Sequence, residues 1–184
     1  KSAVVLPLTH NNEIIGSIGF DAVKEIRTFK ETEIQLLQVL AEIVTNGMLR
    51  KKADLTIRKS EAEYRTLFNN MAQGVVYQDV HGQIVKGNKA AEDVLGLSLD
   101  QMMGRTSLDP RWHTIHEDGS PYPGEQHPAM ITLKTGLPVH NKEMGVYNPL
   151  TNSYKWIIIN TEPEFTGNEK LTSRVFSTFT DITE

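Results

Sequence analysis

Apolar residues follow three different patterns along the chain. Short apolar runs at 3–8 and 13–20 flank Thr9-His10-Asn11-Asn12, which predicts a β-hairpin because asparagine accepts the positive φ of tight turns. From 28 to 71 apolar residues recur every three or four positions, which indicates helix. After residue 73, strand-like runs and short helical patterns alternate. The sequence therefore predicts a hairpin, a long helical region, and a mixed α and β region.

The helical region carries an apolar stripe with coiled-coil spacing. It follows a capping box at Thr28-Phe29-Lys30-Glu31. The stripe positions are Ile34, Leu37, Ala41, Val44, Met48, Lys51 and Leu55. Such a stripe fits either a dimer seam or a face packed on an adjoining domain, and we expect the seam. A second capping box, Ser60-Glu61-Ala62-Glu63, and a new apolar face from Tyr64 predict that one helix ends or bends near 56–60 and another begins.

The last region alternates strands with short helices. Strands are expected at 73–79, 83–87, 138–148, 153–163 and 173–181, with turns at 148–152 and 166–168. Helices are expected at 88–95, after the capping box Ser98-Leu99-Asp100-Gln101, and at 125–134, ended by Gly96, Gly104 and Gly136. Residues 105–124 look like an irregular loop. This order predicts an α+β fold with a five-stranded antiparallel sheet and short helices on one face.

Composition narrows the class of protein. The 184 residues are 39% apolar and 23% charged, which is ordinary for a soluble globular chain. The absence of cysteine excludes disulfides, zinc thiolate sites and thiol nucleophiles. A net charge of −4 argues against nucleic acid as a partner. No apolar run approaches the ~20 residues of a membrane span, so we expect a cytoplasmic segment without membrane contact.

The first residue is Lys1, with neither an initiator methionine nor a signal peptide pattern. We therefore expect a piece of a longer protein, and a membrane anchor elsewhere in that parent stays open.

No motif for catalysis is present. The sequence lacks phosphate-binding loops, a G-x-S-x-G elbow and an H-E-x-x-H helix, so we expect no enzyme activity in these residues. The sharpest metal-like cluster is His113-x-x-His116-Glu117-Asp118, with His127 nearby. Asp118-Gly119 also fits simple turn chemistry, and we expect no metal site here.

Residues 61–184 resemble a PAS domain, the sensory fold common in prokaryotic signalling kinases. The resemblance rests on the order of several segments, which are Glu63-Tyr64-Arg65-Thr66-Leu67-Phe68, Gly74-Val75-Val76-Tyr77, Asn88-Lys89-Ala90-Ala91-Glu92, Glu117-Asp118-Gly119-Ser120 and His127-Pro128-Ala129-Met130. The closing Phe179-Thr180-Asp181-Ile182-Thr183-Glu184 is the most specific of them. It is typical of the place where a PAS domain ends and a signalling helix begins.

The first fifty residues are similar to the end of a GAF domain. Ile15-Gly16-Ser17-Ile18-Gly19-Phe20 and Phe29-Lys30-Glu31-Thr32-Glu33 carry this similarity. It implies three parts: a truncated GAF hairpin at 1–31, a signalling helix at 32–60 and the PAS domain at 61–184. The parent would then be a sensor with GAF and PAS units in series, most often a histidine kinase, with a kinase or other output domain downstream.

The resemblance implies an internal cavity between sheet and helices, typically apolar with a few polar groups. The candidate lining residues are Trp112, His127, Met130, Leu133, Tyr147, Trp156 and Ile158. The identity of any small-molecule ligand is open. We expect no cofactor. Haem held by His127, at the start of the helix where haem-binding relatives place a histidine, is the alternative.

Asp181 belongs to the closing motif and is the candidate relay residue. In the family such an aspartate often links the last strand to a neighbouring strand, and Lys155 and Arg174 are the candidate partners. The alternative is an exposed aspartate that caps a following helix.

The sequence thus predicts a sensory module, and not an enzyme, that passes a ligand or partner signal through coiled-coil helices and forms a homodimer. Two rival hypotheses remain: a ligand-independent dimerisation module, and a haem-based redox or gas sensor.

Overall fold

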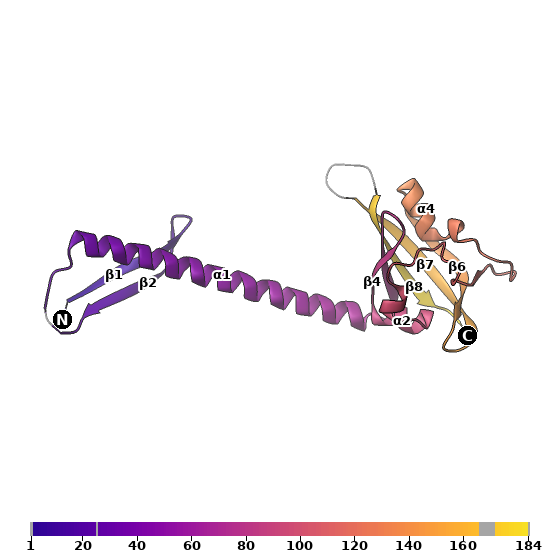
Figure 1. Cartoon of the computed structure of the whole chain (residues 1–184), viewed down its shortest axis with the longest axis horizontal. Helices are drawn as coiled ribbons and strands as arrows, with labels where there is room; N and C mark the ends of the chain where they lie inside the picture. The colour runs from indigo at the N-terminus through magenta and orange to yellow at the C-terminus, as the bar shows by residue number, and fades with distance from the viewer. Residues whose placement is uncertain (1, 25, 166–171, 184) are drawn as a thin grey trace. The chain divides into compact units, whose positions relative to one another are not determined.

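A computed structural model describes residues 2–24, 26–165 and 172–183. The chain divides into two compact units, Lys1–Tyr64 and Arg65–Glu184. Figure 1 labels their elements. No helix within the described residues is long and apolar enough to cross a membrane.

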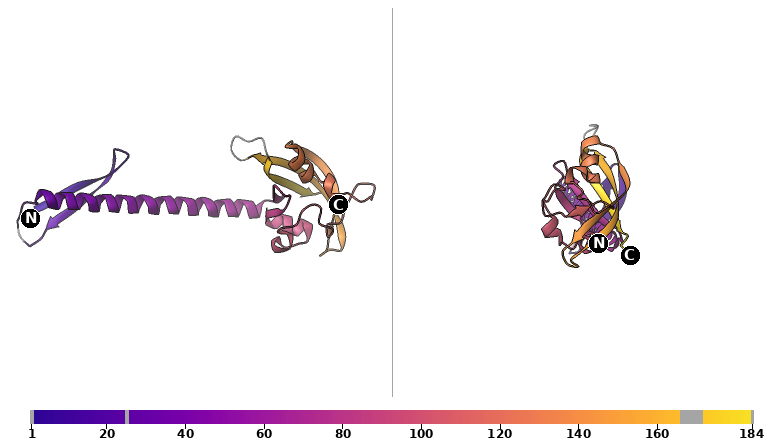
Figure 2. Two further views of the ribbon diagram at one scale, coloured as in Figure 1. Left: turned by 45° about the horizontal axis from the view of Figure 1, so that its top comes forward. Right: turned by 90° about the vertical axis from the view of Figure 1, so that its right-hand side faces the viewer.

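The first unit is a hairpin with a helix along one face (Figure 2). Strands β1 (Ser2–His10) and β2 (Glu13–Ala22) pair antiparallel, and Asn11 and Asn12 adopt φ values of 48° and 65° in the turn, so the predicted hairpin is confirmed. Leu6, Leu8 and Ala41 form the buried centre of the unit. Ile34 and Leu37 pack against it. Three of the stripe positions expected to meet a partner therefore contact the chain's own hairpin.

Helix α1 runs without interruption over Glu31–Asn70. The predicted end or bend near 56–60 is therefore wrong. No glycine or proline lies between Gly47 and Asn70, so continuing the helix requires less free energy than nucleating a second one. Glu63 does not cap a new helix at Ser60, because its carboxylate lies 3.8 Å from Lys59 one turn earlier. The helix begins at Glu31, two residues later than the Thr28 capping box predicts, and there the Lys30 N–H donates to the Glu33 carboxylate at 2.8 Å.

The second unit is built on a six-stranded antiparallel sheet with strand order β4-β3-β8-β7-β6-β5. Its strands are β3 (Gly74–Asp79), β4 (Ile84–Gly87), β5 (Thr114–Ile115), β6 (Val139–Asn148), β7 (Ser153–Phe165) and β8 (Thr172–Asp181). The α+β fold and the five expected strands are confirmed. The sixth, β5, is a two-residue strand inside the expected loop, too short to show a pattern. The expected turn at 166–168 lies outside the described residues.

Short helices cover one face of this sheet, as expected. They are α2 (Lys89–Leu95), α3 (Leu99–Met102), the 3-10 turn η1 (Gly124–Gln126) and α4 (Pro128–Thr135). Figure 1 shows α4 lying beside β6 and β7. Gly96 and Gly136 end their helices with φ of 67°, and the Ser98 capping box is present. The helix expected from residue 125 starts at Pro128, because the residue before a proline is pushed into an extended conformation and His127 has ψ of 140°.

Asn88 joins three parts of this unit. Its side-chain oxygen accepts from the Val75 and Ala91 amides, and its amide group donates to the Phe68 and Gln73 carbonyls, all between 2.8 and 3.0 Å. The end of α1, the start of β3 and the start of α2 are thereby fixed together. Only 1% of Asn88 is exposed, so each of these bonds is shielded from water.

Candidate functional site

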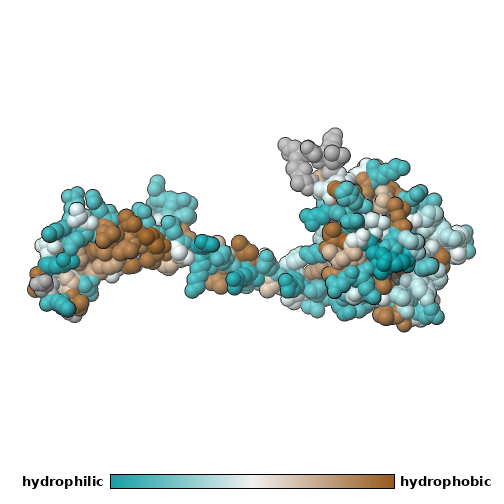
Figure 3. Space-filling view, viewed as in Figure 1, coloured by the Kyte–Doolittle hydropathy of each residue, from teal (hydrophilic) through white to brown (hydrophobic). Residues whose placement is uncertain are grey.

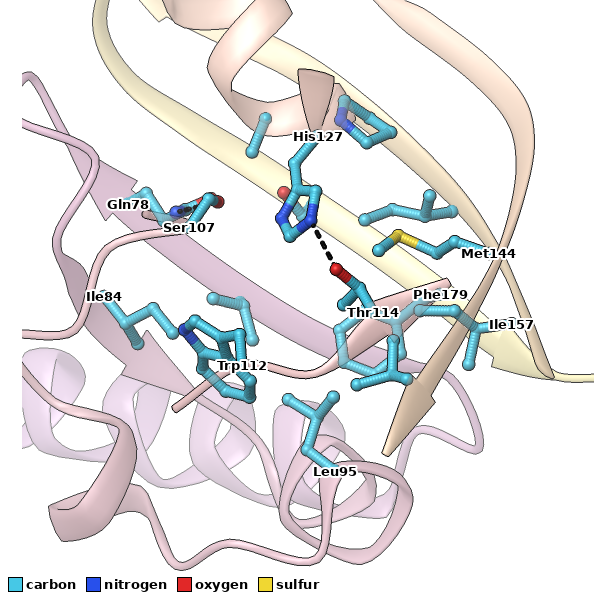
Figure 4. A pocket seen from close by; sticks show the side chains of 16 residues that line it. Gln78, Ile84, Leu95, Ser107, Trp112, Thr114, His127, Met144, Ile157 and Phe179 are labelled. Atoms are coloured by element: carbon cyan, nitrogen blue, oxygen red, sulfur yellow. Dashed lines mark hydrogen bonds between the residues drawn. The ribbon is translucent and has the colours of Figure 1, made fainter. Parts of the chain in front are cut away.

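A cavity of about 90 Å³ lies between the sheet and the helices of the second unit. Its walls are mostly apolar and come from strands, helices and the loop at 105–124, namely Val76, Ile84, Leu95, Trp112, Met144, Val146, Ile157, Ile159 and Phe179. Figure 4 shows Trp112 and His127 on the loop and helix side, with Met144, Ile157 and Phe179 on the sheet side. Five lining residues are polar, Gln78, Ser107, Thr114, His127 and Ser177, and none is Asp, Glu, Lys or Arg. The site is thus an apolar chamber without charged side chains.

Strand alternation decides which residues reach the cavity. Successive side chains of a strand point to opposite faces. In β7 this directs Ile157 and Ile159 inward, and in β8 it directs Ser177 and Phe179 inward. On each of these strands, therefore, the residues that line the cavity are those whose side chains point to the face covered by the helices.

His127 is fixed in one tautomer by its neighbours. Its Nε2 lies 2.9 Å from the Thr114 hydroxyl and 3.3 Å from the Tyr122 carbonyl. The Thr114 hydroxyl donates its own proton to the same carbonyl at 2.8 Å, so Nε2 must carry the hydrogen. Burial lowers the pKa of His127 and outweighs the opposite effect of the bond to the Tyr122 carbonyl. The imidazole is therefore neutral at pH 7.

Ser177 is the polar lining residue whose side chain makes no hydrogen bond within the described residues. It is 2% exposed, and its hydroxyl has no hydrogen-bond partner within the described residues. By contrast, the Gln78 amide donates to the Gly82 carbonyl at 2.9 Å. Buried polar atoms are usually paired, so an unpaired hydroxyl at a cavity wall marks a point where a bound molecule can supply the partner.

Two of the seven predicted lining residues, Trp112 and His127, do line the cavity. Met130 and Leu133 do not, because they extend from α4 toward the β3–β4 turn, where a side chain at Gly82 would meet them at 3.0 and 3.5 Å.

Tyr147, Trp156 and Ile158 lie at the alternate positions of β6 and β7 and face the other side of the sheet. There the Tyr147 ring meets Tyr154 edge-on, and its hydroxyl donates to Asn152. These five expectations are corrected by strand parity and by the direction of α4.

Sequence reasoning missed Ser177, Thr114 and Gln78 as well as most of the apolar lining. For Ser177 and Gln78 a signal existed: both alternate with buried apolar residues, Phe179 and Val76, on their strands. Thr114 gave no signal, because β5 is too short for a pattern.

Of the two candidate partners of Asp181, Lys155 pairs with it and Arg174 pairs with another residue. Lys155 Nζ lies 3.0 Å from the Asp181 carboxylate, which joins β7 to the end of β8. Arg174 instead lies 3.6 Å from Glu164. Partial burial pulls the pKa of Asp181 upward, but hydrogen bonds from Thr183 and Lys155 together hold it below its usual value. Asp181 is therefore an ionised link between two strands.

The histidine and acidic residues of the metal-like cluster at 113–118 do not gather into a metal site in the described part of the chain. Within the part of the chain that the structure describes, no three His, Asp or Glu side chains converge on one point, and the His116 ring stacks on Tyr122 at 4.0 Å. The cavity volume of about 90 Å³ is below the ~150 Å³ of an apolar cavity that holds one benzene ring, whereas a porphyrin joins four pyrrole rings. In addition, the Nε2 atom of His127 is already engaged by Thr114 and Tyr122. Haem does not fit this site.

Comparison with known proteins identifies the family. The sequence profile of the PAS fold matches residues 62–182, and the chain belongs to the PAS family. Domains of this family are typically non-catalytic sensory modules. Sporulation kinase E of Bacillus subtilis is 31% identical over 86 residues, a match that spans 44% of this chain and 12% of that kinase.

Solved structures share the fold at lower identity. A PAS domain of an HTR-like protein from Haloarcula marismortui is 15% identical, with a TM-score of 0.54 over 72% of this chain and 99% of that one. The E. coli DhaR(N)–DhaL complex contains a chain that is 17% identical, with a TM-score of 0.57 over 98% of this chain and 55% of that one. At these identities the likeness establishes the fold alone.

Proposed function

We propose that this chain is the signal-input module of a signal-transduction protein, in which a small molecule in the cavity alters the strands that lead to the output. One observation carries the proposal: β7 and β8 both line the cavity and also hold the Lys155–Asp181 pair. Ile157 lines the cavity and lies directly opposite Asp181 in the register of these strands. A change in cavity occupancy therefore reaches Asp181 through adjacent residues.

The end of β8 is suited to two arrangements. Asp181 accepts from the Thr183 amide at 2.9 Å, and the Trp156 amide donates to the Thr183 hydroxyl at 2.8 Å. These contacts join the last residues to β7 and are exposed enough to be exchanged for water. A ligand that binds one arrangement more tightly shifts the population, and no bond chemistry is required.

Mass spectrometry under native conditions, on the chain purified from its own host, tests this function. A Val146→Phe variant fills the cavity, and Val85→Phe, on the exposed side of β4, is the matched control. We expect the unsubstituted chain and Val85→Phe to retain a small molecule and Val146→Phe to lose it. Circular dichroism should show that all three proteins are folded. Equal retention by Val146→Phe would place binding elsewhere and contradict the proposal.

In the whole parent protein, we propose a histidine kinase in which residues 1–31 end a GAF domain, 32–60 form the signalling helix and 61–184 form the PAS domain. The likeness to sporulation kinase E supports a kinase. On this proposal the segment lies in the cytoplasm and passes its signal to a downstream output domain.

We further propose that the module is a homodimer whose interface lies on α1. The face that packs on the hairpin is occupied, but another face of α1 exposes Leu36, Val39, Leu40 and Ile43 to between 42 and 63% (Figure 3). Leu36, Leu40 and Ile43 are spaced by four and three residues, as a seam between two parallel helices requires. This seam is displaced around the helix from the stripe at 34–55 expected from the sequence.

A further inference from the structure

The Ser177 hydroxyl on the inner face of β8 is buried without a hydrogen-bond partner among the described residues. Ser177 lies between Val76 of β3 and Thr161 of β7 in the register of the sheet. The Thr161 hydroxyl is paired with Thr132 at 2.7 Å, whereas the buried Ser177 hydroxyl has no partner in the described part of the chain. Because a hydroxyl both donates and accepts, the missing partner can be either an acceptor or a donor.

The other polar lining residues each make a hydrogen bond within the protein, and among them the Ser107 hydroxyl accepts from the Gln78 amide at 3.5 Å. Thr114 donates to the Tyr122 carbonyl, His127 shares its Nε2 hydrogen with Thr114 and that carbonyl, and the Gln78 amide bonds Gly82. A bound molecule would have to break a bond within the protein to use any of these three groups. Ser177 requires no such exchange, because its buried hydroxyl has no hydrogen-bond partner in the described part of the chain, and this makes it the preferred anchor.

The wall carries no charge that could pair with a charged ligand. No lining residue is acidic or basic, and His127 is held neutral by its surroundings. Arg105 stacks over Trp112, with 5.7 Å between its guanidinium carbon and the ring centre, but it does not line the cavity. Burying an ion without a counter-charge is costly, so the cavity disfavours ions.

The volume of the cavity limits the size of the ligand. The cavity volume of about 90 Å³ is below the ~150 Å³ of an apolar protein cavity that holds benzene, so the ligand can be no larger than one small ring. Two aromatic side chains, Trp112 and Phe179, form part of the wall. Aromatic side chains pack favourably against other rings by stacking or edge contact.

Building on the proposed function, we propose that the cavity selects an uncharged, single-ring molecule with one hydrogen-bonding group held by Ser177, as in small hydroxylated aromatic or heteroaromatic compounds. Ser177 is then a specificity-determining residue. It distinguishes a ring with a hydroxyl group from the same ring with a methyl group.

Phenol, toluene and benzoate test this class, because the first two have the same shape and the third carries a charge. Binding is followed by chemical shift changes of the Ser177 and Thr178 amides in NMR titrations of the full chain. We expect phenol to bind more tightly than toluene, and benzoate not to bind. Ser177→Ala should weaken phenol binding by about two- to tenfold, the effect of one neutral hydrogen bond, and leave toluene unchanged.

Ser173→Ala is the matched control. Ser173 lies on the same strand, but its hydroxyl donates to the Glu164 carbonyl away from the cavity, so neither probe should be affected. The proposal is overturned if Ser177→Ala weakens both probes equally or neither, if benzoate binds as tightly as phenol, or if no probe binds. A charged or much larger molecule retained from the host would also overturn it while leaving the proposed sensory function intact. Loss of the sensory function would instead appear as equal retention by Val146→Phe.

Discussion

Both units of the chain place a helix against antiparallel strands, yet they differ in how much apolar surface they cover. The hairpin unit has a buried centre of Leu6, Leu8 and Ala41. Among its described residues, the PAS unit has eleven buried residues in its core cluster, including Val76, Ile157 and Phe179. The hairpin unit also leaves Leu36, Leu40 and Ile43 exposed. Apolar burial drives folding, so we expect the PAS unit to be stable by itself and the hairpin unit to need further contacts.

The units also differ in their buried polar groups. In the PAS unit Asn88 and the pair Thr132–Thr161 join separate elements. In the hairpin unit the buried Thr45 donates to the Ala41 carbonyl of its own helix. Buried polar bonds between elements fix one arrangement of those elements, whereas a bond within one helix does not. The PAS unit is therefore the more specifically ordered of the two.

The largest effect is expected when the units are separated. Residues 62–184 alone should unfold cooperatively on heating, since they contain the whole core cluster. Residues 1–64 alone should show no cooperative transition, because a single hairpin with one helix buries too little. Circular dichroism of both fragments measures this. A sharp transition for 1–64 at low concentration would contradict the contrast between the units.

Next in size is the loss of the Asn88 side chain. Asn88→Ala leaves buried backbone groups of Val75, Phe68 and Gln73 without partners and should lower the free energy of unfolding by about 3 kcal/mol, measured in urea. Asn69→Ala, at an exposed position of α1, is the control and should change it by less than about 0.5 kcal/mol. Similar effects from both would mean that the Asn88 network is not formed.

The exposed apolar face of the first unit should show its role in association. Replacing Leu40 and Ile43 together with glutamine should weaken self-association about a hundredfold, or by about 2.7 kcal/mol, because each dimer loses four apolar side chains from the seam. Sedimentation measures this, with Leu150→Gln in the β6–β7 turn, 81% exposed, as control. If the double variant self-associates as strongly as the unsubstituted chain, the interface lies elsewhere.

A smaller effect should distinguish the buried threonine pair of the PAS unit from the buried Thr45 of the hairpin unit. Thr132→Val leaves the Thr161 hydroxyl with only a 3.4 Å contact to the Pro128 carbonyl and should cost about 1.5 kcal/mol. Combining it with Thr161→Val should recover part of that loss, because both partners are then apolar. Thr45→Val should cost less than about 0.5 kcal/mol, since it removes a bond local to one helix. Equal costs for Thr132→Val and Thr45→Val would remove this distinction between the units.

The smallest effect concerns the link at the end of β8. The pKa of Asp181 is lowered, so its contribution to stability is present above the unfolded value near 3.8 and is lost as the pH falls through the folded pKa. Lys155→Met should reduce stability at pH 7 by less than about 1 kcal/mol and flatten the loss of stability below pH 4. Urea unfolding between pH 7 and 3 measures both. An unchanged acid profile would show that Lys155 does not set the ionisation of Asp181.

Helix ends and strand positions in the PAS unit were predictable because local chemistry determines them. Asn88 and Ser98 cap α2 and α3, and Gly96 adopts a positive φ that ends α2. The closing Asp-Ile-Thr segment indicated the fold and Asp181 as a candidate link between strands, but it left Lys155 and Arg174 both open as partners. The uninterrupted course of α1 past Ser60 was not predicted, because a capping box does not end a helix that good helix-forming residues continue.

The sequence by itself determined most of the elements and their order, because helix caps, glycine stops and strand patterns act locally. Only the tertiary structure decided which residues meet in the cavity. The run Trp156-Ile157-Ile158-Ile159 is apolar at every position, so it contains no alternation that assigns one face to the helices. That assignment depends on the neighbouring strands and on the helices that cover them, and it places Ile157 and Ile159 in the cavity. The unpaired hydroxyl of Ser177 likewise exists only once three strands and the loop enclose it, because hydrogen bonding is a property of the assembled fold.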